Sequence, residues 1–232
     1  MRRSAEVMTG ESRSPLRQIA GPGPSPAEGP VHIVVAGTIA TGKTTLTEAL
    51  AARFGLPAVV ERPDANPFLE RFYANQRRWA FGSQLWFATD SAQQHAEIHR
   101  RSGGVQDHSI YENVHVFGAA LAAHGALAED EWDLLQAATA PVIDSLPPPS
   151  LVILVEAPVE VLLERIDVRG RPYEAGIDHR YLTELTQTRR EFFERWTRSP
   201  VLLLDSDAID LRQPQQTEII AESLIDYSPK LK

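Results

Sequence analysis

Hydrophobic positions along the chain fall into two patterns: short uninterrupted runs, and longer stretches in which apolar residues recur every three or four positions. Uninterrupted runs are typical of strands buried on both faces, and they predict strands at 31–36, 58–60, 151–155 and 201–204, with a further short strand that leads to Asp107. The recurring pattern predicts helices at 43–54, 78–101, 110–124, 129–146, 158–168, 178–196 and 217–225, with Gly103 and Gly104 ending the second of them. Strands that alternate with helices predict an α/β fold, with a five-stranded parallel sheet and helices on both faces.

The first 30 residues lack either pattern. Seven of the ten positions at 21–30 are Gly or Pro, and the residues before them are mostly polar. Such a composition does not supply enough apolar surface to offset the entropy of ordering the chain. We therefore expect a disordered leader over 1–30 and a single domain over 31–232.

Composition narrows the function classes. The chain has 232 residues and no Cys, which excludes disulfides, thiolate metal sites and a thiol nucleophile. Its net charge of −8 is unfavourable for binding a nucleic acid over a broad face. No apolar run reaches the roughly 18 residues of a membrane span. We expect a cytoplasmic protein that binds neither nucleic acid nor membrane.

The turn after the first predicted strand has the sequence of a phosphate-binding loop. Residues 37–44 read Gly-Thr-Ile-Ala-Thr-Gly-Lys-Thr and match the pattern G-x-x-x-x-G-K-[ST], between a strand and a helix as that motif requires. Backbone N–H groups, the helix N-terminus and Lys43 would bind phosphate oxygens, and Thr44 would hold Mg²⁺. The expected nucleotide-binding residues here are Gly37, Thr38, Ile39, Ala40, Thr41, Gly42, Lys43, Thr44 and Thr45.

Other features restrict the class of nucleotide-binding protein. Lys43 is the only Lys before the C-terminal tail, so the Asn-Lys-x-Asp motif with which GTPases bind guanine is excluded. The apolar strand ending in Asp-Glu that motor ATPases carry is also missing. The remaining class transfers a phosphoryl group to a small acceptor, which requires a base, an acceptor pocket and arginines over the phosphates. Arg165 and Arg169 share one face of a predicted helix, and Arg171 follows a glycine.

Several segments, in this order, resemble the deoxynucleoside kinase family, which includes deoxycytidine, deoxyguanosine and deoxyadenosine kinases. They are 61–63, 66–69, 72–73, 78–81, Gln84, 107–113, 165–171 and Glu174. The resemblance extends over about 31–210. It implies a P-loop kinase that uses ATP and Mg²⁺, an Arg-rich lid at about 165–176 that contributes Arg165, Arg169 and Arg171, and a homodimer formed through the helices within 110–146.

The resemblance also implies roles for single residues. Glu61 matches the general base, and its place at the carboxyl end of a strand suits a ligand site of an open α/β sheet. Asp107 matches the acidic residue that helps Thr44 to hold magnesium. The residues that match those contacting the nucleoside are Tyr73, Gln84, Phe87, Phe117 and Glu174.

Four positions depart from the family's pattern, and we keep all four as candidate substrate contacts. His108 replaces an Arg that bridges the base carboxylate, the attacking hydroxyl and the donor phosphate, so we also count it as catalytic. Arg62 is unusual beside Glu61, where it would lower the pKa of Glu61 or bind an anionic group of the substrate. Ser91 and Asn113 replace charged residues. The site that binds the nucleobase is then neutral, which is compatible with uracil or thymine.

These observations support one leading function and leave three alternatives open. The leading function is transfer of the γ-phosphate of ATP to the 5′-hydroxyl of a deoxynucleoside. The departures suggest an atypical kinase that phosphorylates a 2′- or 3′-hydroxyl of a modified nucleoside in a biosynthetic or self-protection pathway. A nucleotide kinase like thymidylate kinase, and a nucleotide-binding module without catalytic activity, are the other two.

Overall fold

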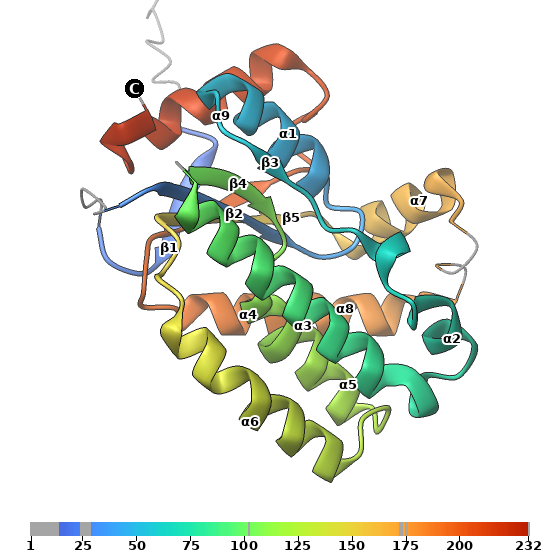
Figure 1. Ribbon diagram of the computed structural model, residues 1–232. Helices are drawn as coiled ribbons and strands as arrows, with labels where there is room; N and C mark the ends of the chain where they lie inside the picture. Colours follow the sequence, from blue (N-terminus) through green and yellow to red (C-terminus); the bar gives the residue numbers. More distant parts are fainter. Residues whose placement is uncertain (1–13, 24–28, 102, 172–173, 175, 232) are drawn as a thin grey trace, which may run out of the picture.

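The fold is built on one sheet, as seen in a computed structural model that describes residues 14–23, 29–101, 103–171, 174 and 176–231. The sheet has the strand order β1-β6-β5-β2-β4-β3, and all neighbours are parallel except β1 and β6 (Figure 1). The strands are β1 (Leu16–Ala20), β2 (Val31–Gly37), β3 (Ala58–Val59), β4 (Gly103–Asp107), β5 (Leu151–Glu156) and β6 (Val201–Asp205). The expected five parallel strands are therefore present, and β1 is a sixth, antiparallel one.

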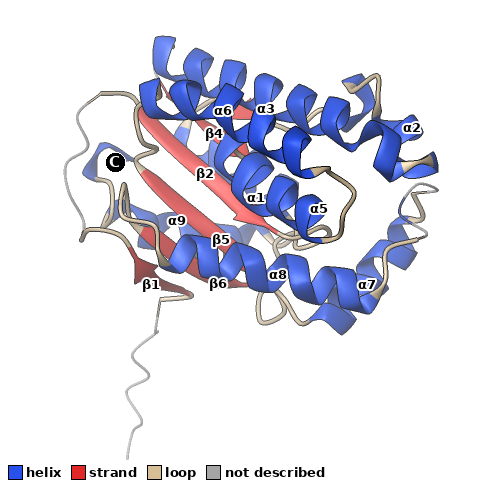
Figure 2. Cartoon of the chain, turned by 90° about the horizontal axis from the view of Figure 1, so that it is seen from below, coloured by secondary structure: helices blue, strands red, loops and turns tan. Residues whose placement is uncertain are grey.

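Helices cover both faces of this sheet. The principal ones are α1 (Lys43–Phe54), α2 (Leu69–Ala74), α3 (Gln76–Arg100), α4 (Ile110–Glu112), α5 (Ala119–Ala123), α6 (Glu129–Ser145), α7 (Val159–Arg169), α8 (His179–Glu194) and α9 (Pro214–Ile225). In β2, Ile33 and Val35 pack with α1 and α9, whereas Val34 and Ala36 pack with α3, α4, α6 and α8. Successive side chains of a strand point to opposite faces, so this uninterrupted apolar run lies between two cores (Figure 2).

The helix expected over 110–124 is interrupted. Between α4 and α5 the chain forms a π-helical segment, η2 (Asn113–Gly118). Such segments are rare and occur often at functional sites. The turn carries Asn113 and Phe117, both of which line the cavity described below.

Gly103 and Gly104 lie inside β4 and do not end the preceding helix, contrary to the expectation from sequence. A Cβ atom on Gly104 would lie 3.0 Å from Cγ1 of Ile98, so a larger residue would crowd α3. Glycine here permits close packing of α3 on the sheet, which is a different use from helix termination.

The expectation of a disordered leader over 1–30 is wrong for residues 16–20. They form β1, in which Leu16 lies opposite Leu204 of β6 and is buried in the α1/α9 core. No Gly or Pro interrupts 16–20, whereas seven of the ten residues at 21–30 are Gly or Pro, so the composition of the whole leader concealed a five-residue strand. Residues 1–13 and 24–28, to which the same expectation applied, lie outside the described residues.

The parallel strands all end at one edge of the sheet. The phosphate-binding loop follows β2, and Asp107 ends β4 beside it. Helices α2 and α7 extend past this edge (Figure 2). In the described part of the chain, no helix is long and apolar enough to cross a membrane.

The strand β1 yields a prediction about stability. Replacing Leu16 with Ala should lower the free energy of unfolding by about 2–3 kcal/mol, because a buried leucine leaves a cavity when truncated. Urea denaturation followed by circular dichroism measures the change. Arg17→Ala, at the exposed neighbouring position, should have almost no effect; equal values for the two variants would contradict the docking of β1.

Candidate active site

The loop at 37–42 has the tight geometry that a phosphate site needs. A Cβ atom on Gly37 would lie 2.6 Å from the Val155 carbonyl oxygen, so only glycine fits there. The Lys43 Nζ donates a hydrogen bond to the Thr38 carbonyl oxygen at 3.0 Å, and Thr41 Oγ1 donates to the same oxygen at 2.9 Å. Burial lowers the pKa of Lys43, an effect that an anionic ligand would oppose. The loop therefore places an ammonium group at the start of α1.

Thr44 and Asp107 supply oxygen ligands suited to a magnesium ion. Thr44 Oγ1 donates to Asp107 Oδ2 at 2.5 Å, across the gap between α1 and β4. The other carboxylate oxygen, Oδ1, is buried and makes no hydrogen bond to any described residue. Magnesium binds carboxylate and hydroxyl oxygens, so these residues fit the ion that the sequence predicts.

A cavity of about 760 Å³ opens beside these residues, and its walls come from helices α1, α2, α3, α5, α7 and α8, from β4 and η2, and from the segments between them. Of the residues expected to contact a nucleoside, it is lined by Glu61, Tyr73, Gln84, Phe87, Asn113, Phe117 and Glu174. Lys43, Thr44 and Asp107 also line it. The donor-phosphate, metal and acceptor residues predicted from separate parts of the sequence therefore meet around one space.

Glu61 lies where the carboxylate can act as a base. Burial raises the pKa of Glu61, and the nearby charges of His108 and Lys43 lower it in part. A carboxylate with a raised pKa binds a proton more strongly than a free one. Arg62 does not lower this pKa as expected, because its side chain points to Asp90 and forms an ion pair there.

Gln84 carries an unsatisfied acceptor in the cavity wall. Its side chain is 6% exposed, and Oε1 makes no hydrogen bond within the described residues. A buried amide oxygen without a donor is costly, so a ligand that donates an N–H group would stabilise it. Phe87 and Phe117 line the same cavity.

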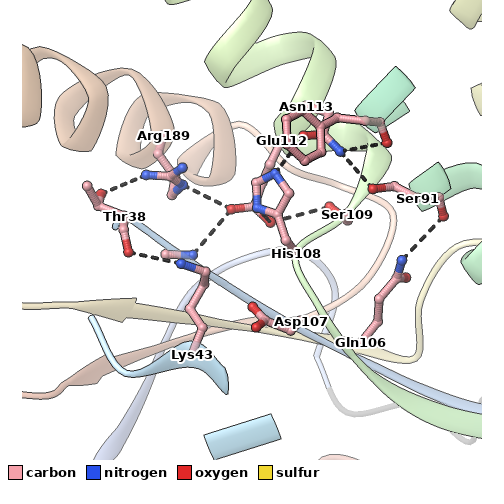
Figure 3. Close-up of polar contacts among 12 residues, drawn as sticks. Thr38, Lys43, Ser91, Gln106, Asp107, His108, Ser109, Glu112, Asn113 and Arg189 are labelled. Carbon is pink, nitrogen blue, oxygen red and sulfur yellow. Dashed lines mark hydrogen bonds and ion pairs between the residues drawn. The ribbon is translucent and has the colours of Figure 1, made fainter. Parts of the chain in front are cut away.

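His108 lies behind the cavity, in a network with Glu112, Asn113 and Ser91 (Figure 3). The Asn113 Nδ2 donates to the Phe87 carbonyl oxygen and to Ser91 Oγ, so its Oδ1 is the atom that faces His108 Nε2 at 2.9 Å. His108 Nδ1 faces Glu112 Oε2 at 3.3 Å. Both ring nitrogens thus face acceptors, and only the doubly protonated imidazolium donates to both.

The charges around His108 agree with this assignment. Burial would lower the pKa of His108, but the Glu112 carboxylate outweighs it and raises the pKa above the usual value. Burial would raise the pKa of Glu112, but His108 and Arg189 lower it to about 2. His108 also has a φ of 70°, which is a strained backbone conformation for a residue other than glycine.

Glu112 and Arg189 are two site residues that the sequence analysis did not select. Glu112 Oε1 accepts from the Gly37 N–H at 3.2 Å and from Arg189 Nε at 3.0 Å, and Arg189 Nη1 donates to Thr38 Oγ1 at 2.6 Å. Arg189 is 1% exposed. The sequence did contain a signal for the burial of Arg189. Its spacing places it on the same face of α8 as the apolar residues Leu182, Leu185 and Phe193.

The arginines expected to converge over the phosphates lie in two places. Arg165 donates to the Ser206 carbonyl oxygen at 2.8 Å and lines a second cavity of about 460 Å³ beside the phosphate-binding loop. Arg169 and Arg171 line the large cavity and pair with Glu174 at 2.6 and 3.6 Å. Glu174 is therefore held by the arginines in this structure.

Three expected substrate contacts do not line the large cavity. Arg62 has a mostly exposed side chain that pairs with Asp90. Ser91 accepts from Asn113, and His108 is buried against Glu112 and Asn113. Ser91 and His108 reach the cavity wall through Asn113, whereas Asp90, the partner of Arg62, does not line the cavity.

Comparisons with known proteins agree with this geometry. The family model described as "Deoxynucleoside kinase" matches residues 33–226. The deoxyadenosine/deoxycytidine kinase of Bacillus subtilis is 32% identical over 197 residues, 84% of this chain and 89% of the relative. The deoxyadenosine kinase of Dictyostelium discoideum is 31% identical over 188 residues, 80% of this chain and 76% of the relative.

A solved structure shares the fold. Deoxyadenosine kinase from M. mycoides with bound dATP superimposes with a TM-score of 0.72 at 20% identity, covering 84% of this chain and 99% of that one. The family match and the identity to the Bacillus kinase together settle the classification. The chain belongs to the deoxynucleoside kinase family, whose members are phosphotransferases with an alcohol group as acceptor.

Proposed function

We propose that the protein transfers the γ-phosphate of ATP to the 5′-hydroxyl of a deoxynucleoside with the help of Mg²⁺. The observation that carries this proposal is the convergence of Glu61, Lys43 and Asp107 on one cavity with the unsatisfied amide of Gln84. This reaction requires a general base, a phosphate site, a metal site and a group that binds the edge of the nucleobase.

On the donor side, the phosphate-binding loop and Lys43 bind the phosphates of ATP. Arg165 and the loop that contains Ser206 border the second cavity, to which we assign the adenine. Thr44 and Asp107 would hold the magnesium ion, which supplies positive charge to the donor phosphates. Arg169 and Arg171 are close enough to the cavity to stabilise charge on the transferred group.

On the acceptor side, the cavity suits a nucleoside. Gln84 pairs with the edge of the base, because an amide both accepts and donates, and Phe87 and Phe117 pack on its faces. Tyr73 and Glu174 bind the sugar. Asn113 does not read the base directly, because its amide nitrogen and oxygen are engaged by Phe87, Ser91 and His108.

Glu61 accepts the proton of the attacking hydroxyl. The oxygen of the 5′-hydroxyl forms a bond to the γ-phosphorus as the bond from phosphorus to the β–γ bridging oxygen breaks, and ADP leaves. The hydroxyl proton passes to the Glu61 carboxylate. Because burial raises the pKa of Glu61, activity should fall as the pH falls through that raised value.

The position of His108 favours the 5′-hydroxyl over a ring hydroxyl. The replacement of the family's Arg by His was the main reason to consider a re-aimed acceptor. Both ring nitrogens of His108 face acceptors, which favours a positively charged ring at this place, and His108 bonds to Glu112 and Asn113 without lining the cavity. Histidine at position 108 thus affects the residues that hold the cavity wall in place and not the wall itself.

Replacing Glu61 with Gln should lower kcat by about a hundredfold or more, with little change in the KM for ATP, because only the proton acceptor is removed. The assay incubates the protein with ATP, Mg²⁺ and each deoxynucleoside, and assigns the product by phosphorus–proton NMR correlation. The expected wild-type product is a 5′-monophosphate.

The matched control is Glu70→Gln, at an exposed position of α2, which should retain wild-type kcat. Full activity of Glu61→Gln would overturn the role of Glu61. Phosphate found on a 2′- or 3′-hydroxyl, or transferred only to a nucleoside monophosphate, would overturn the proposed acceptor.

The charge on His108 gives a second prediction, on stability. A raised folded pKa means that the stabilisation is fully present below the unfolded value of 6.5 and is lost as the pH rises through the folded pKa. The wild type should therefore lose stability relative to His108→Gln as the pH increases above neutral. Urea denaturation at several pH values measures the difference between the two proteins.

Nitrogen NMR provides an independent check of the same charge. At pH 7 both ring nitrogens of His108 should carry protons, whereas those of His95, whose pKa burial lowers to about 4, should show one protonated nitrogen. A neutral His108 ring at pH 7, together with parallel stability curves, would contradict the assignment.

We also propose a homodimer formed through α6. Leu134 and Val142 are 56% and 39% exposed, and the exposed positions between them include Ala137, Ala138 and Pro141. An exposed apolar stripe of this kind is typical of an interface between protein chains. A second copy of the chain would cover it.

Leu134→Glu should convert the dimer to a monomer, because it places a charge on the apolar face that the second copy would bury. Light scattering coupled to size-exclusion chromatography measures the mass. Ile219→Glu, which changes an equally apolar residue that is 46% exposed on α9, is the control and should stay dimeric. A wild type that runs as a monomer would overturn this proposal.

A further inference from the structure

Three histidines lie together at the end of the sheet opposite the active site. His32 is near the start of β2, and His95 and His99 lie one turn apart near the end of α3. One ring nitrogen of each lies within 4.8 Å of one ring nitrogen of both others. Gly37 follows His32 by five positions of β2, which is about 17 Å along a strand. The cluster is therefore distinct from the phosphate-binding loop.

The proton on His32 is fixed by its neighbour Gln106. The Gln106 Nε2 donates to the Ser91 carbonyl oxygen at 3.3 Å and lies 3.5 Å from Gln94 Oε1, so its own Oε1 is the atom that faces His32 Nε2 at 3.0 Å. An amide oxygen only accepts, so His32 Nε2 carries the proton. Burial lowers the pKa of His32 well below its usual value and keeps the ring neutral. Its Nδ1 therefore carries a lone pair.

His95 is fixed in a similar way. His95 Nε2 donates to the Pro147 carbonyl oxygen at 2.8 Å, and the ring is fully buried. Burial lowers its pKa to about 4, so Nδ1 also carries a lone pair at neutral pH. That Nδ1 is buried and has no hydrogen-bond partner in the described part of the chain. A buried acceptor left without a donor indicates that a ligand belongs beside it.

His99 completes the cluster and opens it to solvent. Its Nε2 lies 3.2 Å from His32 Nδ1, to which it donates. The ring is half-buried and stacks on His95, with centroids 5.1 Å apart. Moving the proton of the neutral ring from Nε2 to Nδ1 would give His99 a lone pair facing the other two. The three rings would then present three neutral nitrogen ligands.

We infer that His32, His95 and His99 form a binding site for a divalent transition-metal ion of the zinc class. Zinc bonds to histidine nitrogen at about 2.0–2.1 Å, so two tetrahedral ligands lie about 3.3 Å apart, close to the 3.2 Å between His32 and His99. Imidazole ligands suit zinc, copper, nickel and cobalt better than magnesium. The fourth position faces the open side of His99 and would hold water.

The partners of the outer nitrogens support this inference. Metal-bound histidines usually donate their other N–H to a carbonyl or carboxylate, which orients the ring. Gln106 and Pro147 play that part for His32 and His95 before any metal is bound. The ion would join the end of α3 to the central strand, and α3 also carries Gln84 of the active site. Its role is structural.

Cobalt provides the test, because tetrahedral Co²⁺ with nitrogen ligands absorbs visible light strongly and octahedral Co²⁺ with oxygen ligands absorbs weakly. Protein without a polyhistidine tag is treated with chelator and titrated with Co²⁺ in excess Mg²⁺, which saturates the site at Thr44 and Asp107. We expect one equivalent to give the tetrahedral spectrum, and Zn²⁺ to abolish it. The melting temperature should rise by on the order of 5 °C at a hundred times the Kd of Zn²⁺.

His99→Ala should abolish both the spectrum and the thermal shift, because it removes one ligand at a half-buried position. His179→Ala changes a histidine on the exposed side of α8 and should keep both. The melting temperature of metal-free His99→Ala shows that the variant is folded, and His99→Gln repeats the test with a larger side chain. No tetrahedral spectrum in the wild type, or an unchanged one in both His99 variants, would overturn the inference.

Discussion

The arrangement of the active site depends on the buried carboxylate of Glu112. Its Oε1 accepts from the Gly37 N–H and from Arg189, and its Oε2 faces the imidazolium of His108 (Figure 3). These partners are the last residue of β2, a residue inside α8 and the residue that follows β4, so one side chain joins three separate segments of the chain. A buried charge is stable only when paired and hydrogen-bonded, and removing one partner typically costs about 3–5 kcal/mol. The phosphate-binding loop is therefore held from behind before any nucleotide binds.

The same network sets the charge of the site. Lys43, His108 and Arg189 oppose Glu61, Asp107 and Glu112, so three cations and three carboxylates share a space with little water. Burial weakens the charged form of Lys43 and Glu61, whereas His108 keeps its charge through its contact with Glu112. The anionic phosphates of a bound nucleotide and the cationic metal would add charges of opposite sign to these groups.

Local patterns in the sequence predicted the parallel sheet and the phosphate-binding loop, because each depends on residues that are adjacent in the chain. The residues around the cavity were reached by resemblance, and the structure brings most of them together. Arg189 was missed because its partners, Thr38 and Glu112, are over seventy residues away and only the fold joins them. β1 was missed because a five-residue edge strand gains its stability from pairing with β6, which no local composition records. The role of Arg62 likewise depended on which way its side chain turned.

A continuous set of hydrogen bonds links the active site to the opposite end of the sheet. His108 bonds to Asn113, Asn113 to Ser91, and Gln106 joins the Ser91 carbonyl oxygen to His32. The elements that carry these residues pack in sequence, with η2 on α3, α3 on β4 and β4 beside β2. Ser91 and Asn113, two of the positions where the sequence analysis expected a departure from the family's pattern, are neutral members of this chain of contacts. A charge at either place would need its own buried partner, so the neutral pair fits a site in which His108 already supplies the positive charge and Glu112 the negative one.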